Sequence, residues 1–264
     1  MSRTSTLLIY TRHLLGRFGI TSIWWVIGLA IYNGLIVMTY PSFRESGLLQ
    51  TKNFPPGLLK AFGIENLTEI GPYLDARLFG TLPLVLAFFP VFVFADAIAG
   101  AEERGALDVL LGNPIPRRNV VLANWIAMTL LMIVILVIAA GLTWGSAVVV
   151  DVDLGAAATF RAMLNLWPIS MVFGSFALAL STWIRSRGQV IGISFTVVFL
   201  MYLLDIIGRI SSMWETVHWI TAFRYYRSAM TAPVLWGDTA ILIAANVVLV
   251  VVAVMLFDRR DVYT

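Results

Sequence analysis

The chain has 264 residues, of which 59% are hydrophobic and only 12% are charged, with 18 Lys and Arg residues against 15 Asp and Glu residues. A soluble globular domain carries about a quarter charged residues, so this composition excludes a water-facing surface over most of the chain and predicts a polytopic membrane protein. The absence of cysteine excludes disulfides, thiolate metal sites and a cysteine nucleophile.

The first 19 residues are expected to lie along the membrane surface. Leu7, Leu14 and Phe18 fall on one helical stripe, whereas Arg12 and Arg17 lie off it. This pattern predicts an interfacial helix over residues 1–19, with its basic side toward anionic headgroups. A basic, partly ordered N-terminus is the alternative.

Six apolar runs are each long enough to cross ~30 Å of hydrocarbon as a helix. They cover residues 20–40, 78–100, 119–150, 160–184, 189–207 and 239–257. Pro83 and Pro90 predict a kink in the second run. The third run is longer than a bilayer requires, so it must be tilted, broken near Gly141 or Gly145, or extended beyond the hydrocarbon.

The predicted fold class is therefore all-α. We expect a single transmembrane domain over residues 1–264, with six transmembrane helices, the interfacial helix and a short charged helix between the second and third spans.

An even number of spans places both termini on one side of the membrane. With the termini in the cytoplasm, the inner segments hold ten basic residues in short stretches, and the outer segments hold eight over longer loops. The positive-inside rule therefore predicts cytoplasmic termini, a cytoplasmic segment at 101–118 and an outer segment at 208–237, in a plasma membrane protein.

The charged segment at 101–118 interrupts two apolar runs. Leu107, Leu110 and Leu111 lie on one helix face, and the prolines at 114 and 116 prevent the helix from continuing. Such a helix could bind a partner protein or lie on lipid. Glu102 and Glu103 would be repelled by anionic headgroups, which favours a protein partner.

The outer segment at 208–237 is rich in aromatic residues. We predict that it is re-entrant and forms an outer gate, with an aromatic belt at the membrane interface as the alternative. The gate residues are Trp214, Trp219, Phe223, Tyr225 and Tyr226.

Two carboxylates lie within the apolar runs. Asp96 is near the inner end of the second span and Asp205 is near the outer end of the fifth. Because a buried charge is costly, we expect both to be paired, Asp96 with Arg104 or with a basic inner turn. A role in ion coupling is the alternative.

The sequence offers few residues that could carry out catalysis. His13 and His218 lie on opposite sides of the membrane by this topology, so they can share neither a metal site nor a serine hydrolase site. Ser175, in a span rich in small residues, is expected to serve helix packing. The chain has no Gly-x-x-x-x-Gly-Lys-Ser/Thr motif, so nucleotide energy must come from a partner.

Residues 99–118 resemble the cytoplasmic segment after the second span of ABC-2 type ABC transporter permeases, whose pattern is roughly A-x-E-E-x-G-T-L-[DE]-L-L-L-x-x-P-[IV]-S-R. Residues 54–63 and 71–74 are similar to the first outer loop of that family, residues 222–226 and 232–237 to its last outer segment, and residues 257–261 to its closing F-x-R-R-D. Ala106, Pro116 and Asn124 stand where Thr, Ser and Lys are usual.

This resemblance implies a permease subunit, itself not an enzyme, of an ATP-driven exporter. Two permease chains, identical or different, would pair and dock onto two copies of a separate ATPase subunit. The ATPase subunit would bind the ATP and Mg. The permease chain itself would bind no cofactor, metal or nucleic acid. The docking residues would be Glu102, Glu103, Arg104, Gly105, Leu107, Asp108, Leu110, Leu111, Pro114 and Arg117. The alternatives are an ion-coupled or passive membrane carrier or scaffold, and an intramembrane hydrolase that uses Ser175.

Overall fold

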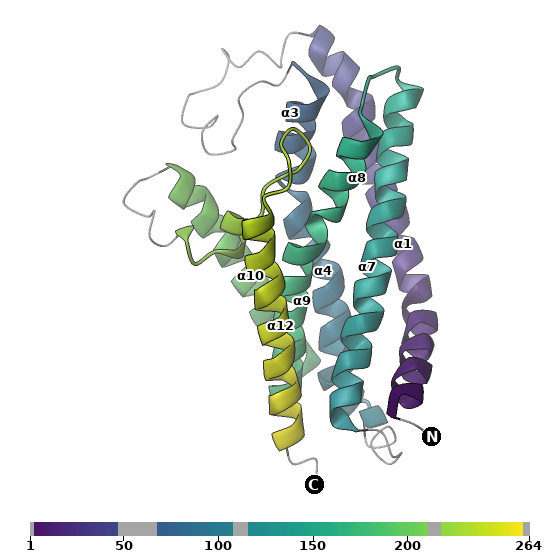
Figure 1. The fold of residues 1–264 in the computed structure, drawn as a ribbon, viewed down its shortest axis with the longest axis vertical. Coiled ribbons are helices and arrows are strands. Elements are labelled where there is room, and N and C mark those ends of the chain that lie inside the picture. Colours follow the sequence, from purple (N-terminus) through teal and green to yellow (C-terminus); the bar gives the residue numbers. More distant parts are fainter. Residues whose placement is uncertain (1–2, 47–67, 108–115, 211–217, 261–264) are drawn as a thin grey trace.

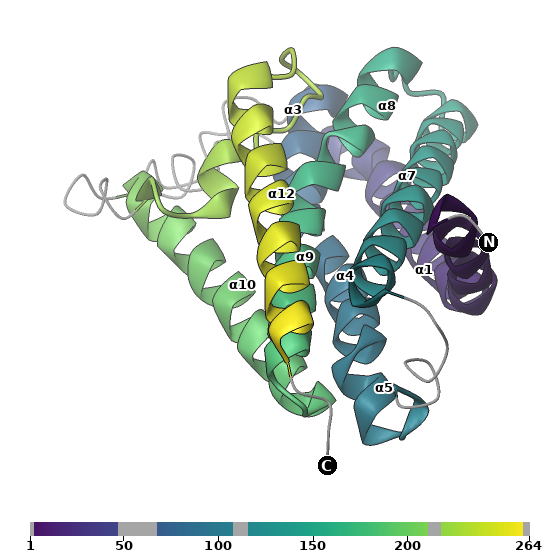
Figure 2. The ribbon, with the colours of Figure 1, turned by 60° about the horizontal axis from the view of Figure 1, so that its bottom comes forward.

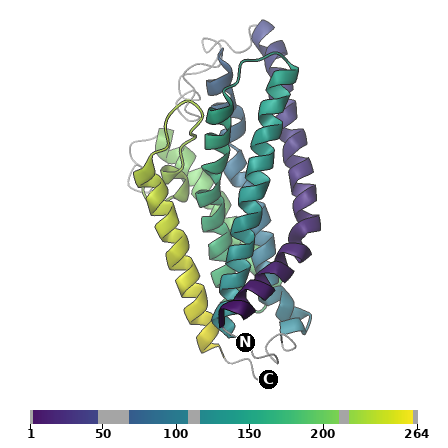
Figure 3. The same cartoon turned by 45° about the vertical axis from the view of Figure 1, so that its right-hand side comes forward.

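The computed structural model describes residues 3–46, 68–107, 116–210 and 218–260. The regular elements in these ranges are all helical and form an elongated bundle (Figure 1). The first helix begins and the last helix ends at the same end of the bundle (Figures 1 and 3), which we call the terminal end; the opposite end is the distal end. The predicted all-α class is confirmed.

Six helical stretches are long and apolar enough to cross a membrane. They are Leu7–Glu45, Ile70–Ala97, Arg117–Val149, Ala156–Trp183, Arg187–Arg209 and Trp236–Arg259. Their number and order confirm the six predicted spans, and the chain is a multi-pass membrane protein.

The centre of the bundle is formed by α4 (Leu82–Ala97) and α9 (Leu166–Trp183), which pack against each other. Helix α12 (Trp236–Arg259) packs on α9 (Figure 2). Most of the apolar side chains of α4 and α9 are buried inside the chain, so these two helices form a compact core.

The outer helices turn large apolar side chains outward. Trp24 on α1 (Arg3–Glu45), Phe199 on α10 (Arg187–Ile210) and Val248 on α12 are exposed. An apolar surface of this extent would be a liability in water, whereas it matches the hydrocarbon of a bilayer.

The first helix is one continuous element. Because α1 runs unbroken over Arg3–Glu45, the predicted interfacial segment at 1–19 is joined to the first span, with no helix boundary near residue 20. Figure 3 shows the first turns of α1 crossing the terminal end before the helix turns along the bundle. The hydroxyls of Thr11 and Ser22 donate to carbonyl groups four residues earlier, both at 2.9 Å, a contact that bends helices.

The second span begins earlier than predicted and is irregular. Instead of one helix over 78–100, α3 (Ile70–Leu74), the π-helical turn η2 (Asp75–Phe79) and α4 follow one another. Pro83 lies in the first turn of α4, where the missing N–H has no helical partner to lose, so only Pro90 lies inside the helix.

The third span is a single helix, α7 (Arg117–Val149), which continues through Gly141 and Gly145. Of the three alternatives for this run, the break at these glycines is therefore excluded. At 1.5 Å per residue α7 measures about 50 Å, so it extends beyond the ~30 Å of hydrocarbon.

The fourth span is interrupted instead. Helix α8 (Ala156–Leu164) ends at Asn165, and α9 begins at the next residue. Pro168 explains the interruption, because it cannot donate the backbone hydrogen bond that would join the two helices across this turn. The side chain of Asn165 donates to the carbonyl group of Arg227 at 2.7 Å, which ties this corner to the last distal segment.

The two central helices approach most tightly at Gly174. A Cβ atom at this position would lie 2.5 Å from the Cβ of Pro90 and 3.0 Å from the ring of Phe94. Gly174 is one of the small residues expected to permit close packing in the fourth span. A larger residue at this position would require α4 to move.

We expect Gly174→Ala to lower the free energy of unfolding by about 1–3 kcal/mol, because the added methyl group overpacks the contact between α4 and α9. Thermal unfolding in detergent measures this effect. Gly192→Ala on α10 is the matched control: no heavy atom lies within 4 Å of its added Cβ, so this variant should be neutral or stabilised by up to ~1 kcal/mol. Equal losses in both variants would contradict the packing account.

Candidate functional site

A cluster of ion pairs at the terminal end is centred on Asp96, in the last turn of α4. Its carboxylate accepts hydrogen bonds from Arg17 of α1 at 2.8 Å and from Arg104 at 2.7 and 3.0 Å. The Nε of Arg187, the first residue of α10, lies 3.3 Å from the same carboxylate. We call these four residues the Asp96 cluster; it joins three separate parts of the chain and confirms the expected pairing of Asp96 with Arg104.

Gly100 makes room for this cluster. A Cβ on Gly100 would lie 2.6 Å from Oδ1 of Asp96 and 3.0 Å from Cδ of Arg187. Sequence reasoning missed Gly100 because a glycine between alanines in an apolar run gives no sign of which side chains approach it.

Glu102 and Glu103 form further contacts at the terminal end. Glu102 pairs with Arg260 at 2.6 Å and with Arg185 at 3.4 Å. Glu103 accepts a hydrogen bond from the backbone N–H of Arg187 at 2.9 Å, at the start of α10, where a negative charge is favourable. The segment with α5 (Ala99–Glu103) is therefore tied to α10 and to the end of α12 as well as to α1.

The hydrogen bonds from Arg104 to Asp96 raise the pKa of the Arg104 guanidinium above its usual value. Arg104 is therefore held in its charged form. Glu102 and Arg104, two of the residues expected to dock a partner, both form ion pairs within the chain.

The remaining docking residues are spread over different environments. Gly105 has a φ of +67°, which favours glycine and ends α5. Leu107 is only 1% exposed, so its side chain packs in the core and is not part of an exposed apolar face. Arg117 donates to the backbone carbonyl of Phe257 at 3.2 Å and to that of Arg260. Asp108, Leu110, Leu111 and Pro114 lie outside the described residues.

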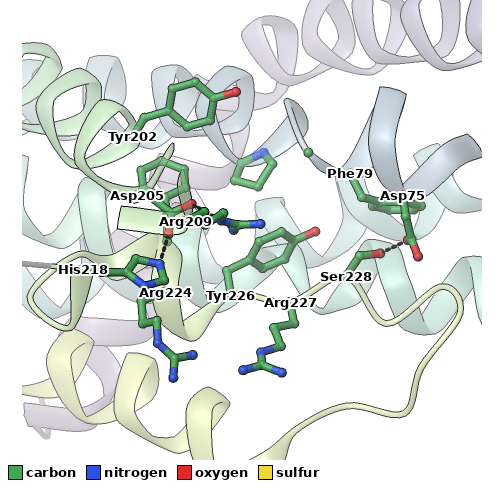
Figure 4. A pocket seen from close by; sticks show the side chains of 13 residues that line it. Asp75, Phe79, Tyr202, Asp205, Arg209, His218, Arg224, Tyr226, Arg227 and Ser228 are labelled. Carbon is green, nitrogen blue, oxygen red and sulfur yellow. Dashed lines mark hydrogen bonds and ion pairs between the residues drawn. The ribbon is translucent and has the colours of Figure 1, made fainter. Parts of the chain in front are cut away.

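A pocket of about 550 Å³ lies toward the distal end, between the η2 turn, the end of α10 and the segment at 218–228 (Figure 4). We call it the distal pocket. It is lined by Asp75, Phe79, Gly80, Pro83, Tyr202, Asp205, Arg209, His218, Phe223, Arg224, Tyr226, Arg227 and Ser228.

Asp205 holds one wall of this pocket together. Its carboxylate, 3% exposed, is bonded to Nε of Arg209 at 2.9 Å and Nη2 at 2.8 Å, and its other oxygen lies 2.8 Å from Nε2 of His218. Gly208 leaves space for His218, because a Cβ there would lie 2.6 Å from the Cβ of the histidine. We call Asp205, Arg209 and His218 the distal latch, since they fasten the segment after residue 217 to α10.

The opposite wall is held by Asp75. The hydroxyls of Ser228 and Thr231 donate to its two carboxylate oxygens. The buried hydroxyl of Tyr226 has no hydrogen-bond partner among the described residues. Burial, together with the nearby charge of Asp75, raises the pKa of Tyr226 well above its usual value, so this hydroxyl keeps its proton.

The proposed gate residues occupy two kinds of position. Phe223, in the 3-10 turn η4 (Ala222–Tyr225), is buried and lies 5.4 Å from the ring of Phe173 and 5.3 Å from that of Tyr202. Tyr226 is also buried and Tyr225 is half-buried. Trp219 is 54% exposed, which is typical of an aromatic residue in an interface belt. Trp214 lies outside the described residues.

Ser175 is part of a buried polar network between helices. It accepts from Nε1 of Trp125 at 3.1 Å and donates to Oδ1 of Asn246 at 2.9 Å; the Asn246 amide in turn donates to the carbonyl of Pro168 at 3.0 Å. An amide oxygen is no general base, so this arrangement joins α7, α9 and α12 and does not activate a nucleophile. Among the described residues no group of three or more His, Cys, Asp or Glu could hold a metal.

Arg187 stands in the short basic turn with Arg185, so its contact with Asp96 confirms the pairing expected with a basic inner turn. Asp75, which follows the Gly-Pro-Tyr-Leu stretch of the outer loop, was not predicted as a site residue. A charged residue at the end of a span is a usable signal, but the sequence does not say which partner Asp75 meets.

The model of one protein family, described as "ABC-2 family transporter protein", matches residues 21–262, which is most of the chain. No individual curated protein matches. The match covers the last five spans in full, the first span from residue 21, the Asp96 cluster except Arg17, and the distal pocket. The chain belongs to the ABC-2 family of transporter proteins.

Proposed function

We propose that this chain is the permease subunit of an ATP-driven exporter whose ATPase is a separate chain. Family membership supports a transporter, and the absence of a P-loop motif from this sequence favours binding of ATP and Mg by another subunit. Two permease chains, identical or different, would pair through lipid-facing helices and engage two ATPase subunits.

The observation that carries the proposal is the placement of α10. Its first residue, Arg187, belongs to the Asp96 cluster, and Asp205 and Arg209 near its other end belong to the distal latch. A helix of 24 residues measures about 36 Å, roughly the thickness of a membrane. One rigid element therefore joins the two charged sites.

The mechanism follows from this connection. An ATPase that moves the segment at 99–118 pulls on Arg17 of α1 and Arg187 of α10 through Asp96. Because most of α10 faces outward, it can tilt more easily than α4 and α9, which are packed tightly at Gly174. A tilt of α10 shifts Asp205 relative to His218 and opens the distal end, so the two packings of α10 are the states that ATP would bias.

The terminal end would then be cytoplasmic. Ten basic residues in short stretches at this end favour that orientation by the positive-inside rule, and it leaves the distal pocket on the outer side of the plasma membrane. Asp96 and Asp205 are both paired with arginine, which speaks against a free carboxylate for ion coupling.

Ala106 provides a test of docking, because it is exposed next to Gly105. We expect Ala106→Trp to reduce the amount of ATPase that copurifies with the chain in mild detergent by about tenfold, a loss of ~1.4 kcal/mol in binding. Gly237→Trp, at an exposed distal position, is the matched control and should copurify normally. Full retention of the ATPase by the Ala106 variant would refute docking at this segment.

A further inference from the structure

The three arginines of the distal pocket differ in how closely a carboxylate approaches each of them. Arg209 is bonded to Asp205 through two nitrogen atoms. Arg227 is 58% exposed and its Nε lies 3.9 Å from Asp238, a distance and exposure at which an ion pair contributes little. Arg224 has no carboxylate within ion-pair distance among the described residues. Among the described residues, Arg224 therefore has no carboxylate partner and Arg227 has only a weak one, Asp238.

Arg224 is nevertheless held in place. Its guanidinium carbon lies 4.6 Å from the centre of the Trp219 ring, and the hydroxyl of Tyr225 donates to the Trp219 carbonyl at 2.8 Å. The backbone N–H of Arg224 is bonded to the hydroxyl of Thr221 at 3.3 Å. Stacking uses the face of the guanidinium, so its in-plane N–H donors stay available. In the part of the chain that the structure describes, no acceptor is bonded to them.

Tyr226 lies between the two arginines in the chain, and its buried side chain lines the same pocket. Figure 4 shows the guanidinium groups of Arg224 and Arg227 extending in the same general direction from this segment, whereas the Tyr226 hydroxyl points the other way. The carboxylate of Asp75 accepts hydrogen bonds from the hydroxyls of Ser228 and Thr231 and forms no ion pair with either arginine among the described residues.

We propose that the distal pocket binds a phosphate-bearing anion, with Arg224 and Arg227 pairing with the phosphate oxygens. Arginine donors suit phosphate oxygens, and a volume of about 550 Å³ is ample for a phospholipid headgroup or a soluble phosphate. Trp219, exposed beside Arg224, is of the type found at headgroup level in membranes. This proposal does not depend on ATP-driven export.

The test uses the full chain in nanodiscs and measures binding, not transport. In the first arm, native mass spectrometry counts the phosphatidylglycerol molecules retained from discs of mixed phosphatidylglycerol and phosphatidylcholine. In the second arm, equilibrium dialysis measures binding of inorganic phosphate in discs of phosphatidylcholine alone. We expect the double variant Arg224→Gln/Arg227→Gln to weaken binding by about tenfold or more in at least one arm.

Two further variants separate binding from folding. Tyr226→Phe removes a hydroxyl that points away from both guanidinium groups, so this variant should fold normally and bind like the natural chain. Arg77→Gln is the control, since Arg77 lies on the same η2 turn as Asp75 but does not line the pocket; its binding should match that of the natural chain. A loss in the first arm alone identifies a lipid headgroup, and a loss in the second arm identifies phosphate itself as sufficient. No difference between the natural chain and the double variant in either arm would overturn the proposal.

Discussion

Asp96→Ala is expected to lower ATP hydrolysis by the assembled transporter by about tenfold or more, which corresponds to the loss of a typical coupling free energy of 1–3 kcal/mol. Removing this carboxylate leaves Arg17, Arg104 and Arg187 facing one another without their shared counter-charge. The segment at 99–107 would then no longer move α1 and α10 together. ATP hydrolysis by the purified complex in proteoliposomes measures the effect.

The cost to stability should be smaller than the cost to coupling. The three arginine side chains are between 43% and 48% exposed, so each pair contributes less than ~1 kcal/mol to folding. Asp258→Ala, at an exposed carboxylate of the same end, is the control and should leave hydrolysis unchanged. Arg104→Ala should have a milder effect than Asp96→Ala, because Asp96 keeps its two other arginines.

Gly100→Ala is a second way to disturb the Asp96 cluster without removing any charge. Its added Cβ would collide with Asp96 and the side chain of Arg187. We therefore expect the same direction of change in ATP hydrolysis as in Asp96→Ala. Normal hydrolysis in both variants, with both folded, would show that the cluster does not transmit motion.

The second large effect is expected at the distal latch. Asp205→Ala should lower the free energy of unfolding by about 2–3 kcal/mol, because it leaves Arg209 and His218 without the buried acceptor that they share. The exposure of Arg209 keeps this value below that of a fully buried pair. Thermal unfolding in detergent measures the loss.

Limited proteolysis distinguishes a local opening from a general loss of stability. If the latch fastens residues 218–228 to α10, cleavage in this segment should rise in Asp205→Ala more than cleavage elsewhere. Asp153→Ala, at an exposed distal position, is the control and should behave like the natural chain. Gly208→Ala should open the same segment, because its methyl group displaces His218. A uniform rise in cleavage along the chain would contradict the latch.

The spans themselves could be predicted from the sequence because a bilayer imposes one simple requirement, about 20 apolar residues per helix. The exact bounds could not. The continuity of α1 depends on the absence of proline before Pro41, a signal that the change from basic to apolar side chains near residue 20 conceals. The break between α8 and α9 depends on Pro168, whose neighbours are apolar enough to suggest an unbroken span.

The sites were predictable only in part. The pairing of Asp96 with Arg104 follows from their spacing of eight residues at one membrane surface, whereas the contacts of Asp96 with Arg17 and Arg187 join distant helices whose mutual orientation depends on packing. Leu107 fits an apolar helix face that could bind a partner, but it is buried in the core. Helical spacing alone cannot distinguish an apolar face that binds another protein from one that packs inside the chain. The distal pocket combines residues 75–83, 202–209 and 218–228, and no local pattern brings these stretches together.

We expect the segment beside Ala106 to contact a P-loop ATPase, and cross-linking measures this contact directly. Because the chain has no cysteine, Ala106→Cys creates a single thiol, as does Gly237→Cys at the distal end. A thiol–amine cross-linker applied to native membranes, followed by mass spectrometry, identifies the protein attached to each position. The account predicts a cross-link from position 106, but not from position 237, to a subunit that contains Gly-x-x-x-x-Gly-Lys-Ser/Thr; a P-loop subunit attached only at 237, or at neither position, would contradict it.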